Sequence, residues 1–234
     1  MGGDPPGGDA AGPAVARADA PATHGFLGAI LVGGKNTRFG DHKGMASVGG
    51  VRIADRARRA LAEAGCARVV LIANEPEAYA PLGLPSRADE RAGLGPLGGL
   101  HAALLWAQEL GAPGALVVAG DMPFVAPGLL RELAESAAGP DTDAAVPLSD
   151  GKRGLEPLCA AYALACLPAI EESAHGGGAR LVSFYDDVRV HAMPKERVAA
   201  FGDPARLFHN VNTREELEEA ERLAAGALVS GRDA

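Results

Sequence analysis

The amino-acid sequence predicts an α/β protein built on a mostly parallel, doubly wound sheet. From Phe26 onward, short apolar runs rich in β-branched residues alternate with longer segments of helical periodicity. Helices of this length between strands form crossover connections, which leave the neighbouring strands parallel. With 234 residues, of which 47% are hydrophobic, the chain is long enough to bury a substantial core.

The strands are expected where the apolar runs are short and are followed by glycine or polar residues. The three clearest runs are FLGAILV, RVVLIA and ALVVA, at residues 26–32, 68–73 and 115–119. Beyond Asp143 the pattern is less regular. There we expect three further strands with some antiparallel pairing, at residues 144–147, 157–162 and 188–192.

The helices are expected where apolar residues recur with a helical period. In the first of them Ile53, Ala57 and Leu61 share one face, and arginines occupy the other. A proline suited to a first helical turn stands at the start of the second and of the third. Thr213 and Glu216 form a capping box at the start of the last. The four helices are expected at residues 53–64, 97–110, 127–138 and 213–225.

Composition restricts the partners and the compartment. The 22 basic and 30 acidic side chains give a net charge of −8, which disfavours binding to nucleic acid or anionic membranes. That balance leaves room for a local cationic pocket that takes a phosphorylated small molecule. The three cysteines form no CxxC pair and no cluster with histidine, so we expect neither disulfides nor a zinc site, and a reducing cytoplasm suits the chain.

The ends of the chain differ from the part between them. Residues 1–25 are rich in glycine, proline and alanine and lack the apolar run of a secretory signal, so we expect a disordered tail there. No apolar run approaches the roughly 20 residues that cross a bilayer. We therefore expect a soluble, cytoplasmic protein with a single domain at residues 26–225 and a short C-terminal tail at residues 226–234.

The loop after the first strand carries the strongest chemical signal. Ligands of parallel sheets bind beyond the carboxyl ends of the strands, and here Gly33 and Gly34 are followed by two cations, Arg38 and Lys43. The loop fits neither the G-x-G-x-x-G pattern nor a Walker A motif. Backbone N–H groups together with arginine and lysine suit the phosphates of a nucleoside triphosphate. A plain solvated turn with two surface cations is the alternative.

Asp121 follows the run ALVVAG, where a parallel strand delivers a side chain to the ligand crevice. A lone carboxylate at such a place can hold Mg²⁺, which takes the rest of its coordination from water and substrate phosphates. The alternative role, capping of the next helix, is disfavoured because Pro127 starts that helix several residues later.

Two further segments supply candidate ligand contacts. Asp89 precedes a glycine-rich stretch, residues 93–99, that leads into a helix, and a helix N-terminus favours anionic groups. Those glycines could equally serve close packing of the helix against the sheet. Asn210 and Asn212 stand just before the last helix, and because capping accounts for Thr213, their amides are left to bind a ribose, a phosphate or metal-bound water.

Together these segments resemble the bacterial molybdenum cofactor guanylyltransferases. The first segment, L-V-G-G-x-x-x-R-F-G-x-x-K, is similar to the signature L-A-G-G-x-S-x-R-M-G-x-D-K of that family. The stretches GPLGG, GDMPF, EPLCA and NVNT follow in the same order, so the resemblance covers Phe26 to about Ala225. The first motif alone marks the wider nucleotidyltransferase superfamily, whereas the full set is more specific.

The resemblance implies a three-layer αβα nucleotidyltransferase fold that uses GTP and Mg²⁺. The implied reaction joins GMP to the terminal phosphate of Mo-molybdopterin and releases diphosphate. It also implies that residues 26–140 form the nucleotide-binding half and residues 141–225 the acceptor half. Proteins that deliver molybdopterin and apo-molybdoenzymes that receive the product are possible partners.

The resemblance also assigns roles to single residues. It implies phosphate contacts for the two cations of the first loop and a Mg²⁺ ligand at the strand-end aspartate, and this set of three would carry catalysis. The nucleotide contacts would come from the first two strand ends and the residues near them. The catalytic set is Arg38, Lys43 and Asp121, and the nucleotide set is Leu31, Val32, Gly33, Gly34, Lys43, Asn74, Asp89 and Asp121.

The chain departs from the family pattern at a few positions. Val32 stands where alanine is usual, which we expect to add bulk beside the base, and His42 replaces the aspartate that normally precedes the lysine. Two alternatives to the guanylyl reaction stay open. One is another nucleotidyltransferase, which uses CTP on molybdopterin or a nucleotide on another phosphate acceptor, and the other is a non-catalytic molybdopterin carrier.

Overall fold

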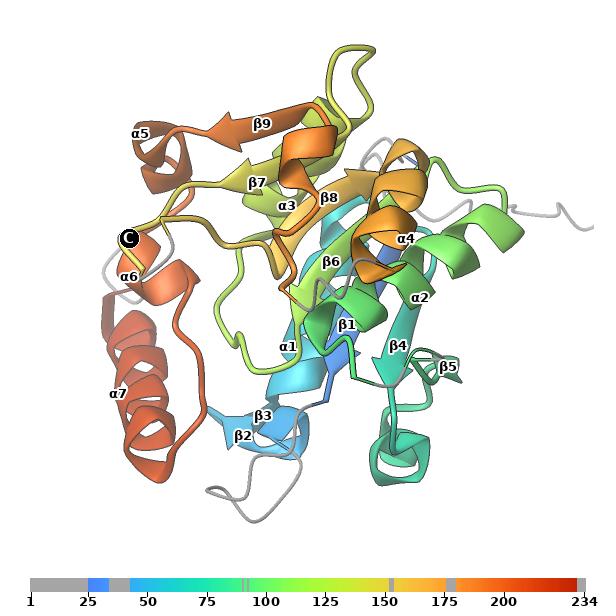
Figure 1. Ribbon diagram of the computed structural model, residues 1–234. Coiled ribbons are helices and arrows are strands. Elements are labelled where there is room, and N and C mark those ends of the chain that lie inside the picture. Colours follow the sequence, from blue (N-terminus) through green and yellow to red (C-terminus); the bar gives the residue numbers. More distant parts are fainter. Residues whose placement is uncertain are drawn as a thin grey trace, which may run out of the picture.

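The computed structural model describes residues 25–33, 43–89, 91, 93–151, 154–175 and 180–230. These residues form an α/β sandwich of three layers, with α1 (Ile53–Ala64) and α3 (Pro127–Ala137) on one face of a central sheet. The helices α2 (Pro96–Glu109) and α4 (Leu167–His175) cover the other face (Figure 1). The predicted fold class is therefore confirmed.

The described residues make a seven-stranded sheet in which one strand runs against the others. The strand β8 (Cys159–Ala163) pairs antiparallel with both of its neighbours, and the remaining pairs are parallel. This is the antiparallel pairing expected beyond Asp143. The order across the sheet is β5 (Ser86–Arg87), β4 (Val69–Ala73), β1 (Leu27–Val32), β6 (Gly114–Ala119), β8, β7 (Ala144–Pro147) and β9 (Val190–Met193).

Shorter elements surround the sandwich. A hairpin of β2 (Ser47–Val48) and β3 (Val51–Arg52) leads into α1, and the last helix, α7 (Arg214–Ser230), packs against it through Val48 and Ala220. The remaining elements are η1 (Lys43–Met45), η2 (Pro76–Leu82), η3 (Leu164–Cys166), η4 (Tyr185–Asp187), α5 (Lys195–Ala199) and α6 (Pro204–Leu207).

Most element boundaries agree with the sequence analysis to within two residues, and α1 agrees at both ends. The last helix is longer than expected, since it runs to Ser230 rather than 225. The helix α4 was not predicted at all. Its only buried apolar side chains are Leu167 and Ile170, which is too short a pattern to indicate a helix by itself.

The core lies on both faces of the sheet because side chains alternate along each strand. Ile30 and Leu116 point to the layer of α1 and α3, whereas Ala29 and Val117 point to the layer of α2 and α4. Close packing of the helix against the sheet, the alternative role of the glycine-rich stretch, is present at Gly99, where a Cβ atom would lie only 3.0 Å from Leu31 Cδ2. The helix α2 can therefore approach β1 closely.

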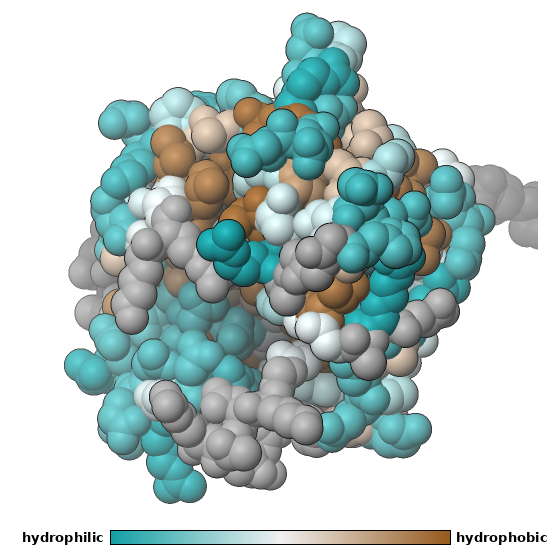
Figure 2. Space-filling view, in the orientation of Figure 1, coloured by the Kyte–Doolittle hydropathy of each residue, from teal (hydrophilic) through white to brown (hydrophobic). Residues whose placement is uncertain are grey.

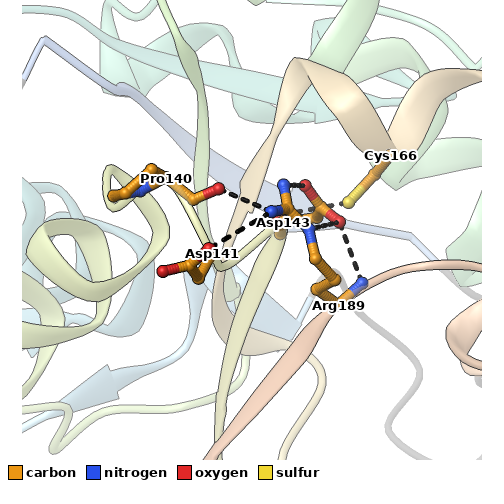
Figure 3. A network of polar contacts seen from close by, with 5 residues as sticks. All are labelled: Pro140, Asp141, Asp143, Cys166 and Arg189. Carbon is orange, nitrogen blue, oxygen red and sulfur yellow. Dashed lines mark hydrogen bonds and ion pairs between the residues drawn. The ribbon is translucent and has the colours of Figure 1, made fainter.

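A polar network ties β7 to β9 at their amino ends (Figure 3). Arg189 donates from Nη2 to Asp143 Oδ1 at 2.6 Å and from Nε to Oδ2 at 3.0 Å, and its backbone N–H also donates to Oδ2. Its Nη1 donates to the carbonyl of Pro140, and the Cys166 thiol donates to the carbonyl of Asp143. The guanidinium of Arg189 lowers the pKa of Asp143 below its usual range. The network holds the outer half of the sheet together.

The three cysteines are buried, and none of them forms a disulfide. Among the described helices none combines the length and the apolar character needed to span a bilayer.

Candidate active site

The carboxyl ends of four parallel strands meet at one edge of the sheet. The strand β1 ends at Val32, β4 leads to Asn74, β5 leads to Asp89 and β6 leads to Asp121. Because β8 runs the other way, its beginning also reaches this edge. In the orientation shared by Figure 1 and Figure 2, these strands run downward across the view, and their carboxyl ends point toward the lower part of the molecule, where the surface of α7 is hydrophilic. The predicted residues therefore gather where ligands of parallel sheets bind.

Lys43, Asp121 and Asn212 meet at the centre of this edge, although they are far apart in the sequence. The Lys43 ammonium donates to Asn212 Oδ1 at 2.5 Å and lies 3.7 Å from Asp121 Oδ2. The Lys43 and Asp121 side chains are 19% and 23% exposed, so the ion pair is largely removed from solvent but still accessible. The backbone N–H of Val211 donates to the carbonyl of Asp121 at 2.9 Å, which joins the two segments directly.

Glu216 positions Asn212 within this cluster. Its carboxylate Oε2 accepts from the backbone N–H of Asn212 at 2.6 Å and from that of Thr213 at 2.9 Å, while Thr213 Oγ1 accepts from the N–H of Glu216. The predicted capping box is thus confirmed, and it has a second acceptor contact that the motif did not indicate. The other amide, Asn210, donates from Nδ2 to the carbonyl of Phe208.

Burial governs the chemistry of Asp121. Removal from water raises the pKa of its carboxyl, the nearby Lys43 charge counteracts that rise, and the negative charge of Glu216 adds to it. A partly desolvated carboxylate beside a lysine gains from any additional cation. The side chain does not cap the next helix, because α3 begins only at Pro127, as expected.

At the part of the edge formed by β4 and β5, Asp89 and Asn74 organise the backbone. Asn74 Oδ1 accepts from the backbone N–H of Asp89 at 2.9 Å, and Asp89 Oδ1 accepts from the N–H of Arg91. The Asp89 carboxylate also lies against the first turn of α2, where a Cβ atom on Gly98 would fall 2.2 Å from Asp89 Oδ2. The glycine at this position is therefore required for the carboxylate to reach the helix.

The side chain of Val32 lies in the core rather than beside a ligand. It is 7% exposed, and its Cγ1 faces Gly120 and Gly44, whose added Cβ atoms would lie 2.3 and 3.3 Å from it. The Val32 side chain therefore fills space in the core below the end of β1, and not space beside a base as we expected. Its backbone is left for contact with a ligand. Leu31 points to the opposite face, and Gly33 is exposed with no atom within 4 Å of its added Cβ.

Two candidate residues of the first loop, Gly34 and Arg38, lie outside the described residues, as does His42. The structure therefore brings together Lys43, Asp121 and Asn212 at one point and Asn74 with Asp89 at another, along the same edge.

Ser149 and Tyr162 belong to this region but gave no signal in the sequence. Ser149 is only 4% exposed and donates to Glu156 Oε1 at 2.6 Å, across the hairpin between β7 and β8. Tyr162, fully buried, donates to the carbonyl of Pro157, and the carbonyl of Leu158 accepts from Ala119, the last residue of β6. These contacts hold the beginning of β8 against the strand that carries Asp121. A serine in a turn and a tyrosine in a strand are too common to have marked them.

The donor set fits a magnesium ion bound jointly with a substrate. No group of three histidine, cysteine, aspartate or glutamate side chains suited to a metal occurs among the described residues, so the chain offers no complete cage there. Mg²⁺ typically uses one or two carboxylates together with water and phosphate oxygens. The half-buried carboxylate of Asp121, beside Lys43 and Asn212, is the ligand that the predicted set supplies at the centre of this edge.

Comparison with known proteins gives consistent results. A family model described as the MobA-like NTP transferase domain matches residues 28–190. A "Probable molybdenum cofactor guanylyltransferase" of Pelotomaculum thermopropionicum is 38% identical over 84% of this chain and 92% of its own length. A "Molybdenum cofactor guanylyltransferase" of Desulfosudis oleivorans is 32% identical over 87% of this chain and 98% of its own.

Solved structures show the same likeness. The molybdopterin-guanine dinucleotide biosynthesis protein A of Archaeoglobus fulgidus superposes with a TM-score of 0.72 at 25% identity, covering 86% of this chain and 100% of its own. The 2-C-methyl-D-erythritol 4-phosphate cytidylyltransferase of Thermus thermophilus has a TM-score of 0.58 at 19% identity, covering 86% and 99%, and shares the fold. The fold and the site thus define a nucleotidyltransferase. Within that class, the chain belongs to the MobA-like NTP transferase family.

Proposed function

We propose that this enzyme is a molybdenum cofactor guanylyltransferase, which transfers GMP from GTP to Mo-molybdopterin. An oxygen of the terminal phosphate of the pterin attacks the α-phosphorus of GTP. The new P–O bond forms as the bond from the α-phosphorus to the β-phosphate oxygen breaks, and diphosphate leaves. The products are the guanine dinucleotide cofactor and diphosphate, so atoms and charge balance without a covalent enzyme intermediate.

The observation that carries this proposal is the cluster of Lys43, Asp121 and Asn212 at the carboxyl edge of the sheet. It stands between the Asn74–Asp89 pair on one side and the beginning of β8 on the other. A nucleotide over β1, β4 and β5 and an acceptor over β8 and β7 would meet at Asp121. This arrangement supports residues 26–140 as the nucleotide-binding half and residues 141–225 as the acceptor half.

The chemistry requires positioning and charge neutralisation more than proton transfer. A phosphate monoester is already anionic at neutral pH, so no general base is needed, which agrees with the lack of a Ser/His/Asp set in the motifs. Lys43 and Arg38 would bind phosphate oxygens and offset the repulsion between two anionic reactants. Asp121 would hold Mg²⁺, which when bound stabilises the charge that builds up on the leaving diphosphate.

The remaining residues would select and orient the substrates. Gly33, Gly34 and the backbones of Leu31 and Val32 would follow the guanine and ribose, together with Asn74 and Asp89. Asn210 and Asn212 would contact the acceptor or metal-bound water. Two glycines at the end of the first strand favour GTP, since cytidylyl relatives tend to have L-A-A-G there.

The decisive experiment measures diphosphate release with Mo-molybdopterin as acceptor, comparing GTP with CTP in the presence of Mg²⁺ and of EDTA. We expect release from GTP with Mg²⁺ and little from CTP. A preference for CTP would instead identify a cytidylyltransferase. A thermal shift with each of the four nucleoside triphosphates and Mg²⁺ is an independent check, because a ligand that binds only the native state raises Tm.

A carrier that hands molybdopterin to apo-molybdoenzymes is the second candidate. Tight pterin binding without diphosphate release would establish it, but the retention of Lys43 and Asp121 as an ion pair favours catalysis. We propose that the enzyme acts in the cytoplasm without nucleic acid or membrane, and that it receives its acceptor from molybdopterin-delivering proteins and passes its product to apo-molybdoenzymes.

A further inference from the structure

A groove of about 560 Å³ lies beside the segment that follows Asp121, between α1 and α6. Its walls are the outer side of α1, the segment at residues 123–127 that follows the Asp121 turn, and residues 201–207 around α6. None of the predicted nucleotide or acceptor residues lines it. We call it the arginine groove, because its polar walls are formed chiefly by Arg56, Arg59 and Arg206.

The three guanidinium groups are held in different ways. Arg56 is fixed by hydrogen bonds from Nε and Nη2 to the carbonyl of Val48, at 3.0 and 2.5 Å. Arg206 stacks over the ring of Phe124, with its Cζ 4.9 Å from the ring centroid. Within the described part of the chain, neither Arg59 nor Arg206 has a carboxylate within ion-pair distance.

The lining of the groove carries more positive than negative charge, although the chain has a net charge of −8. Two acidic residues, Glu63 and Asp203, also line the groove, but Asp203 uses Oδ1 to cap α6 through the N–H of Ala205. Burial lowers the pKa of Arg56, the negative charge of Glu221 counteracts that fall, and the positive charges of Arg59 and Arg206 add to it. The three like charges of the groove therefore repel one another. An anion bound between the guanidinium groups would relieve that repulsion.

The other walls of the arginine groove are apolar. They include Phe124, Val125, Phe201 and Leu207, of which Val125 and Leu207 are buried and the two aromatic rings are half-buried. A ligand that fills the groove therefore needs an apolar or aromatic body as well as an anionic group. Its volume lies within the range of roughly 300 to 1,000 Å³ that is typical of small-molecule sites.

We propose that the arginine groove is a second binding site, for a small aromatic compound that carries a phosphate monoester. A dianionic phosphate matches forked guanidinium donors better than a single carboxylate does. A ring can stack on the planar guanidinium groups and pack against Phe201 and Leu207. The concave shape and limited volume favour a compact molecule over an acidic peptide.

The groove is adjacent to the active site through its Phe124 wall. Phe124 comes three residues after Asp121 in the same turn, and its ring lies 6.3 Å from that of His209, which precedes Asn210 and Asn212. A ligand in the groove therefore contacts the turn after Asp121 directly and is separated from the Asn210–Asn212 segment by the rings of Phe124 and His209. Amide signals of residues 122–126 and 201–209 should report its binding.

The test titrates the full-length protein with phenyl phosphate and follows backbone amide signals by NMR, with calorimetry for the affinity. We expect shifts that concentrate on residues 122–126 and 201–209. The variant Arg59→Gln/Arg206→Gln should weaken binding at least about tenfold, since two charge-assisted contacts are lost. The control Arg68→Gln/Arg222→Gln removes the same charge from exposed positions outside the groove and should bind as the wild type does.

Three further measurements make the proposal refutable. The variant Lys43→Gln should leave phenyl phosphate binding unchanged, and if it alone abolishes binding, the ligand occupies the active site and the proposal fails. Equal affinity for phenyl phosphate and inorganic phosphate would overturn the aromatic requirement. Binding of an acidic peptide but not of phenyl phosphate would show a protein-docking surface instead. Circular dichroism and Tm of each variant establish that it is folded, so that lost binding reflects the groove.

Discussion

At the scale of single residues, the site depends on a few side chains whose charges are partly withdrawn from water. Asp121 has a raised pKa because it is buried, and Lys43 at 3.7 Å offsets only part of that cost. The sequence predicted both residues from their positions after strands. It could not predict that Asn212 accepts from Lys43, because that contact joins residues 169 positions apart in the chain. The capping box indicated Glu216 beside Thr213 but not its further contact with the N–H of Asn212.

The first prediction concerns Asp121→Asn. Replacement by an isosteric amide removes the proposed Mg²⁺ ligand, so turnover should fall by about a hundredfold or more, whereas Tm should stay close to the wild-type value. Steady-state diphosphate release and a thermal melt measure the two effects. A variant with a near-normal rate would exclude Asp121 from the metal role.

The second prediction concerns Glu216→Ala, with Glu218→Ala as control on the exposed side of the same helix. Loss of the two backbone contacts should lower the free energy of unfolding by about 1 kcal/mol, as capping residues typically do. It should also reduce turnover, because Asn212 is no longer held beside Lys43. Denaturant unfolding and diphosphate release are the measurements. Equal behaviour of both variants would contradict a positioning role.

At the scale of elements, the site depends on how closely strands and helices approach one another. The end of β1 lies against the turn after β6, where the backbone N–H of Gly120 donates to the carbonyl of Leu31 at 2.8 Å. The side chain of Val32 occupies the space that a side chain at position 120 would need, so the close approach requires glycine there. The sequence showed the departure from alanine at position 32 but not its consequence, because the direction of that side chain follows from the strand register.

The third prediction is a rescue at this contact. Gly120→Ala should destabilise the protein by about 2 kcal/mol, because the new methyl group would collide with Val32 Cγ1 at 2.3 Å. In a Val32→Ala background the same change should cost much less. A double-mutant cycle of unfolding free energies measures the coupling, and additive effects would show that the two residues do not share space.

The fourth prediction concerns the network that joins β7 to β9. The pKa of Asp143 is lower in the folded protein than in the unfolded chain. The ionised carboxylate therefore stabilises the folded state fully above the unfolded pKa of about 3.9, and this stabilisation is lost as the pH falls through the pKa of the folded state. Asp143→Asn should reduce the free energy of unfolding by about 1 kcal/mol near neutral pH, a modest figure because Arg189 is more than half exposed.

The difference between wild type and Asp143→Asn should narrow on acidification below about pH 4. Denaturant unfolding across the pH range tests this dependence. Asp141→Asn is the matched control, since its side chain is 97% exposed and lies 3.9 Å from Arg189. A constant difference at all pH values would contradict the ionic origin of the effect.

At the scale of the whole molecule, two apolar layers share one sheet. One apolar cluster contains α1 and α3, the other contains α2 and α4, and the two lie on opposite faces of the same strands. Separation of either helix layer would expose the face of the sheet that it covers. The single domain at residues 26–225 stays a prediction, and this arrangement supports it. The three predicted layers and the mixed pairing beyond Asp143 are present in the structure.

The fifth prediction tests the single domain. The one tryptophan, Trp106, lies on α2 with Arg87 4.8 Å from its ring, so its fluorescence reports on that layer. Circular dichroism reports on the helices of both layers. In a cooperative domain the two unfolding curves should coincide in denaturant. Transitions at different denaturant concentrations would show that the layers unfold separately.

The sequence by itself determined the α/β class, six strands of the seven-stranded sheet, the four longest of the described helices, and the residues that stand at strand ends. It could do so because apolar periodicity, glycine and proline act locally along the chain. Only the tertiary structure decided that Lys43, Asp121 and Asn212 form one cluster, that Val32 points into the core, and that three arginines surround a groove. Those features arise from strand order and from packing between distant segments, which no local pattern encodes.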